Sequence, residues 1–220
     1  MLLLQQMVIF FLIMLIGYIC RKVGVFGENT GKMISGIVIN IGNPALIIAS
    51  GMNPETLENK AALLVTLAVA LIFFAIMFVI AELIPRLLRA DREDYGSYQV
   101  MTIFANIGFM GYPLLDAMYG GEAVIHAAIF NLLYSVLIYT YGINRMKTSG
   151  QREKLNGKQL MNVGVISCLI AVTLYISNLP VPMVFKDTAS RIGAVTGPLS
   201  MLVIGDSLAQ IRLKDLFTDV

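Results

Sequence analysis

The stretch FANIGFMGYPLL (Phe104–Leu115) decides how this sequence folds. It lies within a run of residues apolar enough to sit in a lipid bilayer, yet it contains one Asn, two Gly and one Pro. Pro removes a backbone N–H and clashes with the carbonyl four residues earlier, and Gly weakens a helix. In a bilayer, irregular backbone persists only where protein or a water-filled cavity surrounds it. The stretch therefore predicts a broken membrane helix beside a cavity.

The composition indicates an integral membrane protein. Of the 220 residues, 57% are hydrophobic and 14% are charged, whereas soluble domains carry roughly 25% charged residues. The mean hydropathy is +0.78. The apolar residues form seven blocks, each long enough to cross about 30 Å of hydrocarbon. The expected spans are Leu2–Ile19, Met33–Gly51, Ala61–Ile84, Ser97–Met118, Glu122–Ile143, Leu160–Ser177 and Ile192–Ile211.

The basic residues predict how these spans are oriented. Thirteen of the 16 Lys and Arg residues follow spans one, three, five or seven, and three lie on the opposite side. Under the positive-inside rule, this places the N-terminus outside the cell and the C-terminus of the chain in the cytoplasm. The net charge of +2 then reflects topology and does not indicate nucleic-acid binding. The first block is interpreted as a span and not as a cleaved signal peptide, because the basic pair Arg21-Lys22 follows it.

Two further spans carry helix breakers near their midpoints. Gly42-Asn43-Pro44 lies in span two and Gly197-Pro198 in span seven, so three of the seven spans are predicted to be interrupted at depth. Discontinuous helices bring half-helix N-termini, which carry partial positive charge, to the middle of the membrane. No Lys or Arg lies in the middle of any predicted span. The combination favours a transport site for a small anion.

A short internal repeat supports a transporter. NPALIIASG (Asn43–Gly51) and GPLSMLVIG (Gly197–Gly205) match in their Pro and final Gly at an offset of 154 residues. In the predicted topology the two segments cross in opposite directions, so the repeat is inverted, as in many secondary transporters. We expect residues 1–159 to form the first five-span repeat with its cytoplasmic loop, and residues 160–220 to form two spans of an incomplete second repeat. The offset places the counterpart of FANIGFMGYPLL near position 260.

A family resemblance that extends over essentially all 220 residues rests on six segments. They are GYICRK (17–22), NPAL (43–46), NIGFMGYP (106–113), YGG (119–121), the Tyr-rich end of span five (134–141) and GPLSMLVIG (197–205). Together they resemble the auxin efflux carrier family of permeases, which includes plant auxin exporters and bacterial malate and malonate permeases. The resemblance implies an all-α fold of ten helices in two inverted five-helix repeats, similar to the bile-acid symporters. Spans one, two, six and seven would form a scaffold, and spans three to five and eight to ten a moving domain in which broken spans four and nine cross at the substrate.

The resemblance implies a secondary transporter of small organic carboxylates, such as malate, malonate or an auxin-like acid, in the plasma membrane. The implied transporter needs no cofactor or metal. The resemblance leaves open whether transport is coupled to H⁺ or Na⁺ and whether the protein forms a homodimer. The implied substrate-site residues are Asn43, Pro44, Asn106, Gly108, Gly111, Pro113 and, facing the same cavity from span five, Asn131. We expect the amides of Asn43 and Asn106 to donate hydrogen bonds to the carboxylate, and a half-helix starting near Gly111–Pro113 to add its dipole. His126 is either a coupling residue or a hydrogen-bonded packing residue.

Other functional classes explain less of the sequence. The letters GDSL at Gly205–Leu208 match a hydrolase motif, but no His follows Ser207 to act as its base. A retinal protein needs a Lys inside span seven, and the block Ile192–Ile211 has none. The two cysteines, Cys20 and Cys168, are interpreted as buried thiols. The remaining alternative is a non-transporting truncated fragment, or a half-protein that needs a complementing segment.

Overall fold

The structure is a computed structural model that describes residues 2–52, 60–91, 94–104, 106–146, 161–177 and 179–211. All regular secondary structure in these segments is helical. Six helices are long and apolar enough to cross a membrane, and a further apolar helix is shorter. The prediction of an all-α polytopic membrane protein is therefore confirmed.

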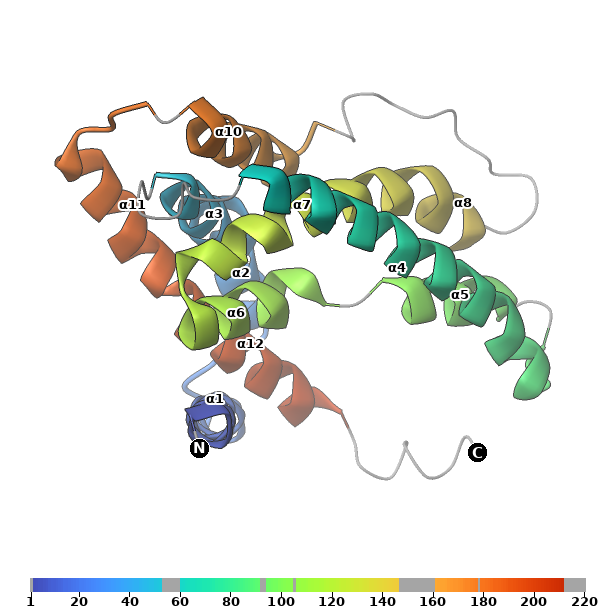
Figure 1. Cartoon of the computed structure of the whole chain (residues 1–220). Helices are drawn as coiled ribbons and strands as arrows, with labels where there is room; N and C mark the ends of the chain where they lie inside the picture. The colour runs from blue at the N-terminus through green and yellow to red at the C-terminus, as the bar shows by residue number, and fades with distance from the viewer. Residues whose placement is uncertain are drawn as a thin grey trace.

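The helices follow the seven predicted spans in chain order (Figure 1). Span one is α1 (Leu2–Lys22). Span two consists of α2 (Thr30–Ile37), the π turn η1 (Val38–Gly42) and α3 (Asn43–Gly51). Span three is α4 (Lys60–Leu87). Span four consists of α5 (Tyr95–Ile103), the π turn η3 (Ile107–Gly111) and α6 (Tyr112–Tyr119). Span five consists of α7 (Gly121–Leu137), the π turn η4 (Ile138–Gly142) and α8 (Ile143–Met146). Spans six and seven are α10 (Val163–Ser177); and α11 (Met183–Ala194) with α12 (Thr196–Gln210). The predicted start of span six, Leu160, and the expected boundary between the repeats lie outside the described residues.

Span seven begins at Met183 and not at Ile192 as predicted. The difference is α11, which carries Lys186, Asp187 and Arg191 among its apolar residues and is therefore not apolar enough to be recognised by hydropathy. It packs against α3. Tertiary packing sets this boundary, and the hydropathy pattern alone does not contain it.

Span four is broken, but a few residues earlier than predicted. Phe104 follows α5 and leaves the helical conformation, with φ −105° and ψ 90°. Asn106 is also non-helical, with φ −79° and ψ 74°, and the helix resumes at Ile107. The second half-helix therefore starts at Ile107, and the expectation that it starts near Gly111–Pro113 is wrong.

Span two is continuous, so the prediction that it is interrupted is wrong, whereas span seven has a helix boundary at Val195, just before the predicted Gly197-Pro198. In span two, η1 joins α2 directly to α3, and the helix runs from Thr30 to Gly51. In span seven, Val195 joins α11 to α12 with φ −76° and ψ −16°, values close to the helical region. α11 thus ends at Ala194 and α12 begins at Thr196, with Pro198 in its first turn. Span two has no free half-helix N-terminus at its proline.

The π turns explain how the chain accommodates Pro44 and Pro113. Each proline lies two residues after the end of a five-residue π turn, and the two turns end at Gly42 and Gly111. In a regular helix, proline clashes with the carbonyl four residues earlier and leaves it without a donor. A π turn bonds to the carbonyl five residues earlier, so the local turn widens. The shared Gly-x-Pro pattern is thus absorbed by a wider turn in both spans.

The helices pack in two groups. In the first, α12 packs against α1 and α2, and α3 packs against α10 and α11; in the second, α4 packs against α5 and α7, α6 against α7, and α5 against α8. The groups meet mainly where α7 contacts α3 and α10. The outer face of α4 is apolar, with Leu64 70% exposed and Ile72 60% exposed, as expected for a surface in contact with lipid.

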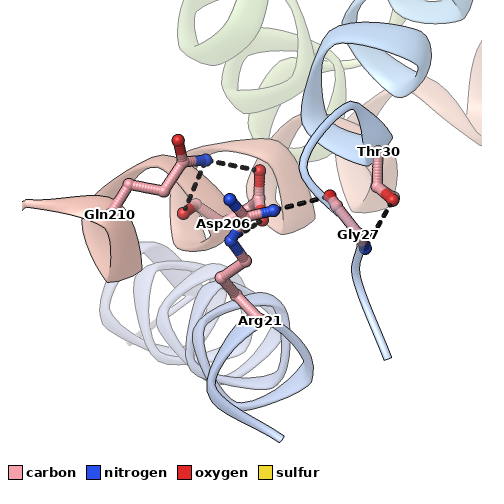
Figure 2. A network of polar contacts seen from close by, with 5 residues as sticks. All are labelled: Arg21, Gly27, Thr30, Asp206 and Gln210. Carbon is pink, nitrogen blue, oxygen red and sulfur yellow. Dashed lines mark hydrogen bonds and ion pairs between the residues drawn. The ribbon is translucent and has the colours of Figure 1, made fainter. Parts of the chain in front are cut away.

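A polar network ties the first group together at one end of α12 (Figure 2). The Nε of Arg21, on α1, lies 3.7 Å from the Oδ1 of Asp206, whose side chain is only 2% exposed. The Nε2 of Gln210 donates to the Oδ2 of Asp206 at 3.0 Å. Arg21 also donates to the carbonyl oxygen of Gly27, in the loop before α2. One arginine thus links α1, α12 and the start of span two.

The contact between α1 and α12 is close enough to require glycine. A Cβ on Gly205 would collide with the carbonyl oxygen of Met14, and one on Gly17 would collide with that of Leu202. We expect Gly205→Ala to lower the free energy of unfolding by about 1–3 kcal/mol, because the two backbones must move apart. Gly36→Ala is the matched control, since a Cβ there meets nothing within 4 Å. Thermal unfolding in detergent should show the loss for Gly205→Ala alone; equal effects would contradict the packing argument.

Candidate functional site

A cavity of about 730 Å³ lies beside the break in span four. Its walls come from η1 and α3, from the second half of span four, from α7 and η4, and from the start of α10. No Lys, Arg, Asp or Glu is among the described residues that line it. Its polar character comes mainly from side-chain amides. Five asparagines line it: Asn40, Asn43, Asn106, Asn131 and Asn162.

Asn106 caps the half-helix that follows the break. Its Oδ1 accepts a hydrogen bond from the backbone N–H of Phe109 at 3.0 Å, which satisfies one of the free N–H groups at a helix start. Within the described part of the chain, its Nδ2 has no hydrogen-bond partner. Ile107 and Gly108, which follow Asn106 at the start of the half-helix, also line the cavity. The amide donor and the positive end of the half-helix therefore face the same space.

Asn162 caps a second helix at the same cavity. Its Oδ1 accepts from the backbone N–H of Val165, at 3.0 Å, at the start of α10. As with Asn106, no described residue accepts a hydrogen bond from its Nδ2. Val163 and Gly164, the first residues of α10, are part of the lining. Two asparagine-capped helix N-termini thus converge on one cavity, an arrangement suited to an anion.

Asn43 lies on the cavity wall but already uses its amide donor. Its Nδ2 donates to the carbonyl oxygen of Gly108 at 3.0 Å and so ties α3 to the broken span. The residue is 7% exposed, and its Oδ1 has no hydrogen-bond partner within the described residues. This differs from the expectation that Asn43 donates to a substrate. Its observed contact positions the broken helix.

Asn131 faces the cavity from α7, as expected. Its Nδ2 donates to the Sγ of Cys168 at 3.5 Å, and the hydroxyl of Tyr112 lies 3.8 Å from the same sulfur. Cys168 is fully buried on α10, in agreement with its interpretation as a buried thiol. Asn131, Tyr112 and Cys168 thus join α7, α6 and α10 under the cavity wall. Cys20, in contrast, is partly exposed.

The other predicted site residues lie elsewhere. Pro44 and Gly111 do not line the cavity, and Pro113 lines a smaller one of about 180 Å³ beside Asp116. His126 is also outside it. Its Nδ1 lies 2.6 Å from the Oγ1 of Thr66, which donates to a carbonyl within α4. Of the predicted residues, the cavity brings together Asn43, Asn106, Gly108 and Asn131.

Sequence reasoning missed Asn162, although a signal for it was present. An Asn directly before an apolar run is a preferred helix N-cap, and Asn162 precedes the run from Val163 to Ser177. The prediction instead started span six at Leu160. Placing the helix start three residues before Val163 put the capping residue inside the helix and concealed its role. Asn40, one turn before Asn43, was missed because the π turn brings it to the cavity.

Comparisons with known proteins agree with a membrane transporter. Residues 2–215 match the family described as membrane transport protein. An uncharacterized transporter of Methanothermobacter thermautotrophicus is 25% identical over 201 residues, which cover 89% of this chain and 65% of the relative. The uncharacterized transporter MJ1031 of Methanocaldococcus jannaschii is 25% identical over 216 residues, 92% of this chain and 68% of the relative. No solved structure matches.

The chain spans about two thirds of the length of these two relatives. The family match nevertheless extends over almost all of its residues, including every helix described above. The matching family is described as a membrane transport protein, and both relatives are named as uncharacterized transporters. The chain therefore belongs to the membrane transport protein family, which is the auxin efflux carrier family that its motifs resemble.

Proposed function

We propose that the protein carries small organic carboxylates across the plasma membrane by alternating access. The observation that carries this proposal is the convergence of two asparagine-capped helix N-termini on one cavity. A carboxylate placed between Asn106 and Asn162 would accept from both free amide groups. The partial positive charge of the two helix ends would stabilise its charge without a buried Lys or Arg.

The cavity has the size and lining of a small-molecule site. Its volume of about 730 Å³ lies within the usual range for ligand pockets, roughly 300–1,000 Å³. Apolar side chains such as Ile47 and Ile107 surround the amide groups. Malate, malonate and an auxin-like acid all combine a carboxylate with a small body. The cavity therefore supports this substrate class without selecting one member.

The packing of the helices supports alternating access. The cavity lies between the two groups, with Asn43 and Asn162 on the first and Asn106 and Asn131 on the second. In the first group, α1 of span one packs on α12 of span seven, and α10 of span six packs on α3 of span two. The first span of each half therefore packs against the second span of the other half. An inverted repeat has this symmetry. We propose that residues 1–159 and 160–220 belong to its two halves, and that the second group slides against the first.

The proposed orientation follows from the basic residues. With 13 of the 16 Lys and Arg on one side, the N-terminus lies outside the cell and the C-terminus of the chain lies in the cytoplasm. A cysteine placed among residues 147–158, in a Cys20→Ser background, should be labelled by a membrane-impermeant reagent only after the cells are opened. Labelling of intact cells would contradict this orientation.

The substrate proposal is tested on the full chain in lipid nanodiscs. We expect radiolabelled malonate to bind saturably and to be displaced by malate, but not by malonamide, its uncharged counterpart. Uptake into proteoliposomes then separates two outcomes. Binding with uptake supports an autonomous carrier, and binding without uptake supports a half-protein that needs a complementing segment. Absence of saturable binding of malonate, malate and indole-3-acetate would overturn the carboxylate proposal.

A further inference from the structure

Four buried side-chain atoms in the described part of the chain have no hydrogen-bond partner. They are the Oδ1 of Asn43, the Oγ1 of Thr196, the Oγ of Ser200 and the Oδ1 of Asp206. All four are oxygens, and all four belong to span two or to α12, which pack against each other. Buried polar groups without partners are rare and costly. Their concentration in one helix contact indicates that something binds there.

Neighbouring side chains account for the burial of the Asp206 carboxylate, but not for that of the other three oxygens. Asp206 is paired with Arg21 and bonded by Gln210 at the far end of α12 (Figure 2). Asn43, Thr196 and Ser200 have 7%, 1% and 0% of their surfaces exposed. None of these three side chains is ionisable, and within the described residues their oxygens have no hydrogen-bond partner. We call the unpartnered oxygens of these three uncharged side chains the oxygen cluster.

The two hydroxyls of the oxygen cluster differ from other hydroxyls on helices of this protein. The hydroxyls of Thr66, Ser167 and Thr173 each donate to the backbone carbonyl four residues earlier. This bond is the usual way for a hydroxyl in a membrane helix to be satisfied. Thr196 and Ser200 do not make it, although they are more deeply buried than most. Their lone pairs remain available to a ligand.

The geometry brings Thr196 and Ser200 towards span two. A Cβ built on Gly42 would lie 2.6 Å from the Oγ1 of Thr196, so this oxygen faces the last residue of the π turn, next to Asn43. Ser200 lies one turn further along α12, on the same face as Thr196. α12 also contacts η1 and η3 directly.

We propose that the oxygen cluster, Asn43 Oδ1, Thr196 Oγ1 and Ser200 Oγ, binds a Na⁺ ion. Hydroxyl and carbonyl oxygens are hard ligands that suit alkali and alkaline-earth cations. All three ligands are neutral, so a divalent ion would enter a buried site without the carboxylates needed to balance its charge. A monovalent cation fits this ligand set. A bound ion would supply the partner that the described residues do not give these oxygens.

The site would connect ion binding to the carboxylate cavity, a consequence that rests on the proposed function. Asn43 is shared: its Oδ1 belongs to the oxygen cluster, while its Nδ2 donates to Gly108 on the broken span. A cation at the Oδ1 withdraws electrons from the amide and strengthens the Nδ2–H···O bond. Na⁺ would thereby favour the position of η3 in which Asn106 faces the cavity. Binding of Na⁺ itself does not depend on this coupling.

Thermal unfolding of the full chain in nanodiscs tests the proposal. At constant ionic strength, we expect Na⁺ at about 100 times its dissociation constant to raise the midpoint by roughly 5–10 °C. K⁺ and choline should raise it much less. Ser200→Ala and the nearly isosteric Thr196→Val should each weaken the apparent Na⁺ affinity by about tenfold or more. Without Na⁺ both variants should remain folded, since each removes an unsatisfied buried hydroxyl.

Ser167→Ala is the matched control. Ser167 is 2% exposed, but its hydroxyl donates to the carbonyl oxygen of Val163. This variant should keep the full shift with Na⁺. An equal shift with Na⁺, K⁺ and choline would overturn the site and leave an ordered water as the occupant. So would a full Na⁺ shift in both Ser200→Ala and Thr196→Val.

The same preparations separate this proposal from the carboxylate proposal. Malonate binding is measured with Na⁺ and with choline. Saturable malonate binding without any Na⁺-specific shift overturns the Na⁺ site and leaves the substrate proposal standing. A Na⁺-specific shift that Ser200→Ala abolishes, without saturable binding of malonate, malate or indole-3-acetate, supports the site and overturns the substrate proposal.

Discussion

Replacing Arg21 by Met is expected to destabilise the protein by about 3–5 kcal/mol, because it leaves a buried carboxylate without its counter-charge. The side chain of Asp206 is 2% exposed, whereas that of Arg21 is 19% exposed. Removing the arginine leaves the charge of Asp206 with Gln210 as its remaining partner in the network of Figure 2. The contact between α1 and α12 should weaken as a result.

Replacing Asp206 should destabilise the protein less than replacing Arg21. Asp206→Asn keeps the shape of the side chain, and Arg21 retains its hydrogen bond to the carbonyl oxygen of Gly27 and its access to solvent. We expect a loss of about 1–2 kcal/mol for this variant. In the double variant Arg21→Met/Asp206→Asn, no charge is left buried. Its stability should therefore be closer to that of Asp206→Asn than to that of Arg21→Met.

The stability of these variants can be measured through the exposure of a buried thiol. Cys168 has no exposed surface, so a thiol-reactive fluorophore reports its exposure on unfolding. A Cys20→Ser background removes the partly exposed thiol. Equal losses for Arg21→Met and Asp206→Asn would show that burial of the carboxylate is not the dominant cost. A double variant as unstable as Arg21→Met would lead to the same conclusion.

Much of the fold could be predicted because the bilayer imposes a simple rule. Spans of sufficient apolar length had to be helices, and α1, α4 and α7 lie where hydropathy placed them. α11 was missed because its polar residues lower its hydropathy, while its packing against α3 makes it part of the span. A window of sequence contains no information about that partner. Boundaries set by tertiary contacts are therefore the ones that sequence reasoning misses.

The helix breakers were located correctly but given the wrong geometry. Pro44 and Pro113 follow the same Gly-x-Pro pattern and the same π turn, yet one span stays continuous and the other breaks. The break is at Phe104–Asn106, where an Asn side chain takes over the capping of the new helix start. A proline alone does not reveal which outcome occurs. The better signal was the Asn before the glycine, at a position suited to an N-cap.

Asn106→Asp is expected to weaken malonate binding by about 10- to 100-fold or more while leaving the protein folded. Asp and Asn are comparable N-caps, so the carboxylate of the variant can still accept from the N–H of Phe109. It cannot donate as the Nδ2 of Asn106 does, and it places a negative charge beside the substrate. Loss of one hydrogen bond to a charged group is worth about 1.5–3 kcal/mol, which corresponds to that range of affinity. Asn106→Asp thus separates the binding role of the residue from its capping role.

Two further variants complete the test. Asn106→Ala removes the cap as well as the donor, so it should lose malonate binding and also about 1 kcal/mol of stability. Asn144→Asp adds the same charge to α8, where the Asn144 Nδ2 donates to the carbonyl oxygen of Thr140 away from the cavity lining, and should bind malonate normally. Binding is measured in nanodiscs and folding by the exposure of Cys168. If Asn106→Asp binds malonate as well as the unmodified protein, Asn106 caps its helix and does not contact the substrate, because the added charge would otherwise repel it. If Asn144→Asp loses binding to the same extent, the effect is one of overall charge and not of the capped helix end.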